Sequence, residues 1–276
     1  MRERGIRESK LFFLIVFVLC FNTPVFSQKR IISLGPSLTE ELYLLGAEKK
    51  IVGCTTYCKC PKEKVGNAIE VNVEKILSLK PDLVLATSLT NQRDIEKLNA
   101  LGINVVTFKT PRNFSEICEQ FLRLARIVKK EQKAKEIIKQ ANTEIEVIKK
   151  RIKGLPRPRV FIQIGARPLF TAPKDLFIND LIELAGGINI ASSKTGLYSR
   201  EKVIEDNPDV IIIVTMGIVG EREKRQWETY KVVEAVKRKR IYFMDSKKVC
   251  NATPLNFIEA LKEIVKLIHP EIKEDG

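Results

Sequence analysis

Three cysteines close together are the residues of this sequence best suited to chemistry. Cys54, Cys58 and Cys60 lie in the string GCTTYCKCP, with the spacing C-x3-C-x-C. Thiolates could bind a soft metal or a metal-containing ligand, and in an oxidising compartment thiols could pair as a disulfide. Closed zinc sites usually contain C-x2-C pairs, which this string lacks. Metal binding, a disulfide, and a loop whose thiols share no role are therefore the three interpretations to weigh.

The rest of the sequence offers little for catalysis. Its one histidine, His269, lies close to the C-terminus, so no Ser-His-Asp set is expected. No G-x-G-x-x-G string follows a predicted strand, and no phosphate-binding P-loop occurs. We expect no catalytic residues, and a secreted Rossmann-like enzyme is the remote alternative.

The N-terminal segment has the pattern of a secretory signal, residues 1–27. Basic residues precede the apolar run LFFLIVFVLCF (11–21), which is too short to span a bilayer as a helix. We predict cleavage near Ser27. A lipid anchor on Cys20 is the alternative, disfavoured because the bulky Leu19 stands where a lipoprotein signal prefers a small residue. Either way, the mature chain is expected in the periplasm or elsewhere outside the cytoplasm.

Composition and charge are those of an ordinary globular protein. Of the 276 residues, 44% are hydrophobic and 30% are charged, and the formal net charge is +14. This length suits one large domain or two lobes. The basic residues are scattered along helix-like segments without interleaved aromatic residues, so we expect a solvated basic surface and no nucleic-acid partner.

An internal repeat indicates that the chain has two halves of similar construction. The strings VEKILSLKPDLVLA (73–86) and REKVIEDNPDVIII (200–213) align without a gap. In each, a short helix is predicted to end before the proline, and an aliphatic run typical of a buried parallel strand follows. Alternating helices and strands predict an α/β fold with two lobes and mainly parallel sheets.

A long helix is predicted to join the two halves. The segment 111–159 has no glycine before Gly154, and apolar residues from Ile137 to Ile148 recur at helical spacing. Its apolar stripe is short for a coiled coil, so packing across both lobes is favoured, with little hinge motion. The predicted boundaries are 1–27 for the signal, 28–112 for the N-terminal lobe, 113–155 for the helical linker and 156–276 for the C-terminal lobe.

The order of several strings resembles a known family, the substrate-binding proteins of ABC importers for cobalamin and iron chelates. In these proteins one rigid helix bridges two pseudo-symmetric, Rossmann-like lobes. The matching strings, between about residues 30 and 271, include RIISLGPSLTEELYLLG, EKILSLKPDLVLA, YSREKVIEDNPDVIIIV and ATPLNFIEALKEIVKLIHPE. The resemblance implies a monomer that binds a small metal chelate and delivers it to an ABC permease dimer with its ATPase. The membrane would be met only through the permease or a lipid anchor.

The resemblance also gives the repeated glutamates a role. Glu74 and Glu201 head the two copies of the repeat and match the family's surface glutamates, which dock onto arginine pockets of the permease. Two pseudo-symmetric carboxylates suit a two-fold symmetric partner. A glutamate in the first turn of a helix is also favoured by the helix dipole alone.

The family binds its ligand between the lobes, at loops that follow the carboxyl ends of the strands. Tyr57 matches an aromatic position that packs on the corrin ring in the cobalamin-binding members. The residues that match cleft positions, or are candidates near them, are Pro36, Ser37, Tyr57, Cys58, Cys60, Thr87, Ser88, Arg167, Phe170, Thr195, Tyr198 and Cys250.

The ligand is expected to be a cobalt- or iron-containing chelate, with no catalytic cofactor. The cobalamin-binding members have a tryptophan-rich cleft, whereas the only tryptophan here is Trp227, in a polar helix-like stretch. A corrinoid, a haem and an iron siderophore are therefore all candidates. Haem normally takes an axial protein ligand, and with His269 predicted away from the cleft, Tyr57 or a cysteine would have to provide it.

The resemblance places the cysteines on both walls of the cleft. Cys58 and Cys60 share a loop with Tyr57, and Cys250 matches a loop of the C-terminal lobe. Thiol coordination of a metal or metallo-ligand, a disulfide within the loop or across the cleft, and no shared role all remain candidates. Cys118 lies on an apolar helix face and is expected in the core. A free divalent-metal binding protein of similar architecture is the second alternative, disfavoured because such proteins typically use histidines in the cleft.

Overall fold

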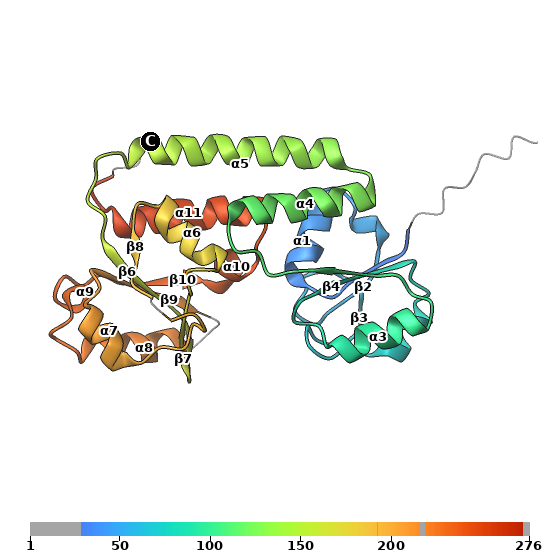
Figure 1. The fold of residues 1–276 in the computed structure, drawn as a ribbon, viewed down its shortest axis with the longest axis horizontal. Helices are drawn as coiled ribbons and strands as arrows, with labels where there is room; N and C mark the ends of the chain where they lie inside the picture. Colours follow the sequence, from blue (N-terminus) through green and yellow to red (C-terminus); the bar gives the residue numbers. More distant parts are fainter. Residues whose placement is uncertain (1–28, 192, 216–218, 273–276) are drawn as a thin grey trace, which may run out of the picture.

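The computed structural model describes residues 29–191, 193–215 and 219–272, which form two α/β lobes side by side beneath a long helix (Figure 1). The signal segment, with Cys20 and Ser27, lies outside the described residues. Among those that are described, no helix combines the length and the apolar character needed to cross a membrane.

The N-terminal lobe is built on a five-stranded sheet in the order β3-β2-β1-β4-β5, in which all paired strands are parallel. Its strands are β1 (Ile31–Ser33), β2 (Ile51–Cys54), β3 (Glu63–Lys64), β4 (Leu83–Thr87) and β5 (Val105–Phe108). Its helices are α1 (Pro36–Leu44), the short 3-10 helix η1 (Glu48–Lys50), α2 (Val73–Ser78) and α3 (Gln92–Ala100). The parallel sheet predicted for this half is present.

The C-terminal lobe has a second sheet in the order β10-β9-β6-β7, with β8 also paired to β6. Its pairs are parallel except for the antiparallel hairpin of β6 and β7. Its strands are β6 (Arg159–Ala166), β7 (Leu169–Thr171), β8 (Ile188–Asn189), β9 (Val210–Thr215) and β10 (Ile241–Asp245). Its helices are α6 (Phe177–Leu184), α7 (Arg200–Asp206), α8 (Val219–Glu228), α9 (Glu234–Lys237), α10 (Ser246–Cys250) and α11 (Pro254–Ile268).

The two copies of the repeat fold alike down to single hydrogen bonds. In the first copy, Asp82 accepts a bond from the backbone N–H of Arg30 at 2.7 Å, and the Arg30 guanidinium reaches the carbonyl of Leu79 at 2.8 Å. In the second, Asp209 accepts from the N–H of Arg159 at 2.8 Å. The Arg159 guanidinium likewise donates to the backbone carbonyl of Asp206, the last residue of α7, at 2.7 Å. In each lobe, the aspartate of the Pro-Asp dipeptide thus anchors the segment that follows the helix to the start of the lobe's first strand.

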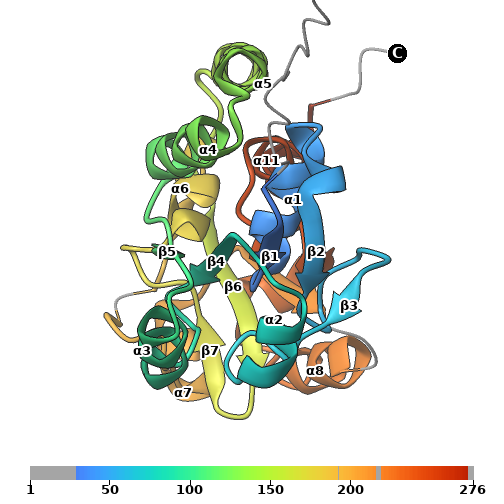
Figure 2. The same cartoon turned by 90° about the vertical axis from the view of Figure 1, so that its right-hand side faces the viewer.

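Two helices cross from one lobe to the other. The long helix α5 (Glu131–Arg151) runs above the shorter α4 (Phe114–Val128), and Figure 2 shows both end-on above the sheets. On α4, Phe114 and Ile117 belong to the core of the C-terminal lobe, whereas Phe121 and Leu124 belong to that of the N-terminal lobe. The predicted long helix is α5, and the shorter α4 crosses beside it, since the apolar face of each is divided between both cores.

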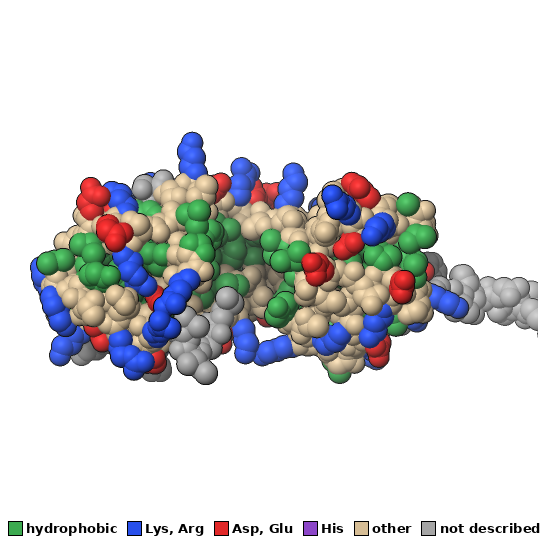
Figure 3. All heavy atoms as spheres, turned by 90° about the horizontal axis from the view of Figure 1, so that it is seen from below, with side chains coloured by type: hydrophobic (Ala, Val, Ile, Leu, Met, Phe, Trp, Pro, Cys, Tyr) green, Lys and Arg blue, Asp and Glu red, His purple; other side chains and the backbone are tan. Residues whose placement is uncertain are grey.

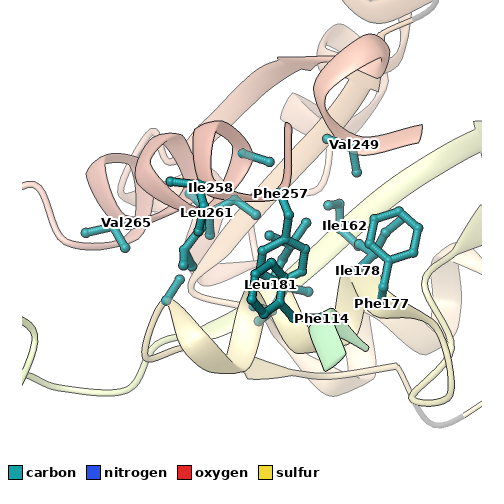
Figure 4. Packing of buried hydrophobic residues seen from close by; sticks show 14 of the residues in the cluster. Phe114, Ile162, Phe177, Ile178, Leu181, Val249, Phe257, Ile258, Leu261 and Val265 are labelled. Carbon is teal, nitrogen blue, oxygen red and sulfur yellow. The ribbon is translucent and has the colours of Figure 1, made fainter. Parts of the chain in front are cut away.

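The helix α11 completes this bridge from below. Figure 4 shows its Phe257 packed against Phe114 of α4 and beside Leu181 of α6, with the two phenylalanine ring centroids 4.7 Å apart. Cys118 lies in the same core, and burial raises the pKa of its thiol to about 12. Its placement matches the prediction of a plain core cysteine.

Candidate ligand-binding cleft

A cavity of about 430 Å³ opens between the two lobes. The N-terminal lobe lines it with the start of α1, with Tyr57, and with residues that follow β4 and β5; the C-terminal lobe contributes Phe177 and the segment 250–252. Seen from below, apolar side chains gather around the hollow between the lobes (Figure 3). The N-terminal wall therefore consists of loops at the carboxyl ends of parallel strands, where ligands of open α/β sheets bind.

The loop after β1 is shaped by a close approach to β4. A side chain at Gly35 would place its Cβ 2.6 Å from the methyl carbon of Thr87, so only glycine fits there without displacing that strand end. Pro36 and Ser37 then begin α1 at the cavity wall. Of the predicted cleft residues, the structure brings six together around this cavity: Pro36, Ser37, Tyr57, Thr87, Ser88 and Cys250.

The rim of the cavity is apolar and exposed. Tyr57 and Leu89, which line the cavity on the N-terminal lobe, are 71% and 63% exposed. Large apolar side chains held this far into water lose unfavourable hydration when a ligand covers them. The rim thus suits a ligand with a broad apolar or aromatic face.

Four predicted residues of the C-terminal lobe do not line this cavity. Arg167 lies at the exposed turn of the β6–β7 hairpin, and Phe170 follows on β7. Thr195 is exposed and bonds to Ser193. Tyr198 packs on Phe161 in the lobe core with ring centroids 5.9 Å apart.

The Tyr198 hydroxyl also donates to Asp206 at 2.5 Å. The ring and the hydroxyl of Tyr198 thus both have partners inside the lobe, and Tyr198 is not part of the lining of this cavity.

The cysteines form a local disulfide, between Cys54 and Cys60. Of the alternatives left open for these cysteines, the structure shows the disulfide within the loop, and Cys60 therefore has no thiolate to offer a metal. Cys58 is a buried free thiol whose sulfur lies 3.1 Å from the hydroxyl oxygens of Thr39 and Thr55, outside the cavity lining. The disulfide and these contacts close the loop that carries Tyr57.

Cys250, on the opposite wall, is a free thiol rather than a partner of Cys58 or Cys60. Burial, and then the charge of Asp245, raise the pKa of its thiol, so that the neutral form is favoured at neutral pH. Among the described residues, no three His, Cys, Asp or Glu side chains are grouped so that they could hold a metal ion.

Comparison with known proteins agrees with this architecture. A family model described as periplasmic binding protein matches residues 31–248. The chain belongs to the periplasmic binding protein family.

Two relatives and one solved structure illustrate the similarity. An uncharacterized ABC transporter substrate-binding lipoprotein of Bacillus subtilis, YvrC, is 34% identical over 257 residues, covering 88% of this chain and 81% of the relative. The vitamin B12-binding protein of Yersinia pseudotuberculosis is 31% identical over 208 residues, or 72% of this chain and 74% of the relative. The crystal structure of a possible iron-binding, periplasmic solute-binding protein of Staphylococcus epidermidis has a TM-score of 0.77 at 28% identity, covering 88% and 99% of the two chains.

In this periplasmic binding protein the repeated glutamates are exposed at equivalent places. Glu74 and Glu201 lie in the first turns of α2 and α7, which are capped by Asn72 and Ser199. A hydrogen bond from its own backbone and one from Ser199 lower the pKa of Glu201, which keeps it ionised. Both helices lie on the side of the molecule away from α5 (Figures 1 and 2).

The tryptophan and the histidine of this periplasmic binding protein belong to the interior of the C-terminal lobe. Trp227 is fully buried, its Nε1 donates to Gln163 at 2.6 Å, and Arg200 lies over its ring. His269 is buried with its Nε2 2.9 Å from the carbonyl oxygen of Ala185. Neither residue lines the cavity, which agrees with the prediction for His269. Trp227 lies on the buried side of α8 together with Glu223.

The cavity also contains a residue that sequence reasoning missed. Glu41 of α1 lines it, is buried, and has no hydrogen-bond partner for Oε2 among the described residues. The signal was present in the helical spacing. Glu41 falls between the buried Leu38 and Leu42, on the apolar face of α1.

Proposed function

We propose that this protein captures a metal chelate outside the cytoplasm and delivers it to the permease of an ABC importer. The observation that carries the proposal is the cavity between the lobes, with the exposed apolar side chains of Tyr57 and Leu89 at its rim, in a family of binding proteins. Relatives that match most of this chain include a vitamin B12-binding protein and a protein described as iron-binding. These names support a corrinoid, a haem or an iron chelate as the ligand class.

Binding without catalysis suits the chemistry of the cavity walls. The polar groups there are hydroxyls, amides, the exposed Lys109 and the buried Glu41, arranged around apolar surface. Tyr57 would stack on the ligand's flat face, and the short disulfide-closed loop would hold it in place before the ligand arrives. For a haem, Tyr57 or Cys250 would have to serve as the axial ligand, since His269 lies in the lobe interior.

Delivery to the permease would use Glu74 and Glu201. Glu74 and Glu201 occupy equivalent positions of the repeat, one on each lobe, and both are exposed. Charge-assisted pairs between these carboxylates and arginines of a two-fold symmetric permease would fix its orientation on the loaded protein.

Calorimetric titration of the secreted protein with cyanocobalamin, haemin, a ferric siderophore and zinc chloride tests the proposal. We expect micromolar or tighter binding of at least one chelate, and weaker binding in Tyr57→Ala. A suitable control is Tyr230→Ala, because Tyr230 packs on Trp227 inside the C-terminal lobe. Tight zinc binding with no binding of the chelates would overturn the proposal in favour of a free metal-ion binding protein.

A further inference from the structure

The buried glutamate of α1 occupies a position where the fold gains nothing from a carboxyl group. Glu41 is 3% exposed, and its Oε2 has no hydrogen-bond partner in the part of the chain that the structure describes. An unpaired carboxylate in such a place is strongly destabilising, whereas leucine would extend the apolar face of α1 without this penalty. Stability therefore does not explain why a glutamate occupies position 41.

Among the described residues, no cation pairs with Glu41: the exposed Lys109 lines the same cavity but is not among the charges that act on it. The groups that act on its charge are Glu40, its neighbour on α1, and Cys118 on α4, whose thiol is neutral at physiological pH. Desolvation, and then the charge of Glu40, raise the pKa of Glu41 well above its usual value. Its carboxyl group is consequently held with a proton, so that it presents both a donor and an acceptor.

A second buried glutamate shows that this fold can satisfy such a group. Glu223 on α8 is 4% exposed, accepts a hydrogen bond from Gln163 at 2.9 Å and forms an ion pair with Arg200. The carboxyl of Glu41 has no equivalent partners, and it lines the cavity between the lobes, whereas Glu223 does not. The terminal torsion of glutamate is broad, so a small rotation turns either oxygen of Glu41 toward the cavity.

We propose that Glu41 is a specificity-determining contact of the transported ligand, and that it selects a chelate whose periphery carries neutral carboxamide groups. The inference rests on the proposed function and names the chemistry of its ligand. A protonated carboxyl and a primary amide match as donor to acceptor and acceptor to donor, which gives two hydrogen bonds in one plane. An anionic group placed against Glu41 would lose its hydration close to the charge of Glu40, and Lys109 of the cavity lining does not act on this position.

The test compares cobyric acid with cobyrinic acid, two corrinoids with the same ring and no nucleotide loop. The side chains of cobyric acid end mainly in carboxamides, whereas those of cobyrinic acid end in carboxylic acids. Cyanocobalamin, which carries carboxamides and a nucleotide loop, is titrated as the complete ligand. Each is titrated calorimetrically into the wild type, Glu41→Gln, Glu41→Leu and the matched control Glu223→Gln, whose substituted residue lies away from the cavity. Haemin, which carries carboxylates, is titrated alongside.

We expect the wild type and Glu41→Gln to bind cyanocobalamin within about threefold of each other, because glutamine also offers a donor and an acceptor. Glu41→Leu should bind it about tenfold more weakly, although removal of the unpaired carboxyl raises its Tm. The preference for cobyric acid over cobyrinic acid should shrink in Glu41→Leu and persist in Glu223→Gln. If Glu41 had only a structural role, its substitution would change Tm without changing this preference.

Three outcomes would overturn the inference. Equal cyanocobalamin affinities of the wild type and Glu41→Leu would remove Glu41 from the ligand contact. Affinity that rises strongly between about pH 6 and about pH 8 would mean that an ionised Glu41 binds a cationic group instead. Tight haemin binding with weak cyanocobalamin binding would sustain the proposed function and refute the selection of carboxamides, whereas failure of the wild type to bind any chelate would refute both.

Discussion

Asn251 of the C-terminal lobe donates a hydrogen bond to Glu40 of the N-terminal lobe, with Nδ2 and Oε2 3.3 Å apart across 211 positions of sequence. The contact joins the connection between α10 and α11 to the first helix of the chain. Its two residues also line a second hollow of about 440 Å³, which shares Pro36, Tyr57 and Asn251 with the ligand cavity. The bond is therefore a direct side-chain link between the two walls of the cleft.

Breaking this link should have a small and measurable cost. Asn251→Ala is expected to lower the free energy of unfolding by about 1 kcal/mol, because it removes a partly buried hydrogen bond to a carboxylate. Glu40→Gln should cost less, since the amide oxygen still accepts. Urea denaturation measures both, with Asn142→Ala, which changes an exposed residue of α5, as the control. Equal losses in Asn251→Ala and Asn142→Ala would show that the link contributes no stability.

The stability of the protein should depend on pH through Glu41. Its pKa is raised in the folded state, so above the usual value of 4.5 the unfolded chain ionises while the folded protein keeps its proton. Stability from this group is fully present below that value and is lost as pH rises toward the folded pKa. Relative to wild type, Glu41→Gln should therefore gain stability with rising pH, at about 1.4 kcal/mol per unit in this window. Urea denaturation from about pH 4 to about pH 8 would show no such trend if Glu41 were already ionised when folded.

The disulfide determines how many thiols of the unfolded protein react with a thiol reagent. The structure leaves Cys58, Cys118 and Cys250 free, so the unfolded, unreduced protein cleaved near Ser27 should titrate three thiols, and the reduced protein five. Retention of Cys20 as a free thiol would add one to each count, whereas a lipid-modified Cys20 would add none and would raise the mass. In the native protein, Cys250 should react before Cys58 and Cys118 because it is exposed and they are buried, but more slowly than a fully solvated thiol because its pKa is raised. A disulfide-specific reagent that found Cys250 oxidised would contradict the pairing.

Removing the disulfide should loosen the loop that carries Tyr57. The double variant Cys54→Ser/Cys60→Ser is expected to lose about 2 kcal/mol of stability, as for a short closed loop. Its chelate affinity should fall as well, because Tyr57 would then be ordered only on binding. Unchanged affinity in this variant would mean that the contacts of Cys58 with Thr39 and Thr55 already order the loop.

Charge reversal of the repeated glutamates should separate docking from binding. Glu74→Arg/Glu201→Arg is expected to abolish stimulation of the transporter's ATPase in reconstituted vesicles, since each arginine would face a cationic pocket. Chelate affinity should stay unchanged, because neither residue lines the cavity. Glu96→Arg, an exposed position on α3, is the control. Stimulation that survives in the double variant would place docking elsewhere on the surface.

Much of the fold could be predicted because the repeat and the helical spacing are local patterns. The Pro-Asp dipeptides mark the same helix end and strand start in both lobes, and the stripe from Ile137 to Ile148 identified the long helix. The division of α4 between two cores could not be predicted in the same way. Its apolar face is continuous in sequence, and only the tertiary structure shows where one lobe's core ends and the other's begins.

The candidate site could be predicted for loops that follow strands directly. Pro36, Ser37, Thr87 and Ser88 come within a few residues of a strand end, so the topology places them. Tyr198 lies on a longer connection, and its contacts with Asp206 and Phe161 turn it inward, which no spacing rule anticipates. The pairing of Cys54 with Cys60 could not be chosen either, because sequence does not decide among neighbouring thiols.

Because α4 and α5 pack into the cores of both lobes, the two lobes are expected to unfold together. A fragment limited to one lobe would leave half of each helix with its apolar face in water, so neither half of the chain is a self-sufficient folding unit. Heating or denaturant should therefore melt both lobes in a single cooperative transition. The same construction resists large changes in the width of the cleft, since widening it would bend two continuous helices at once.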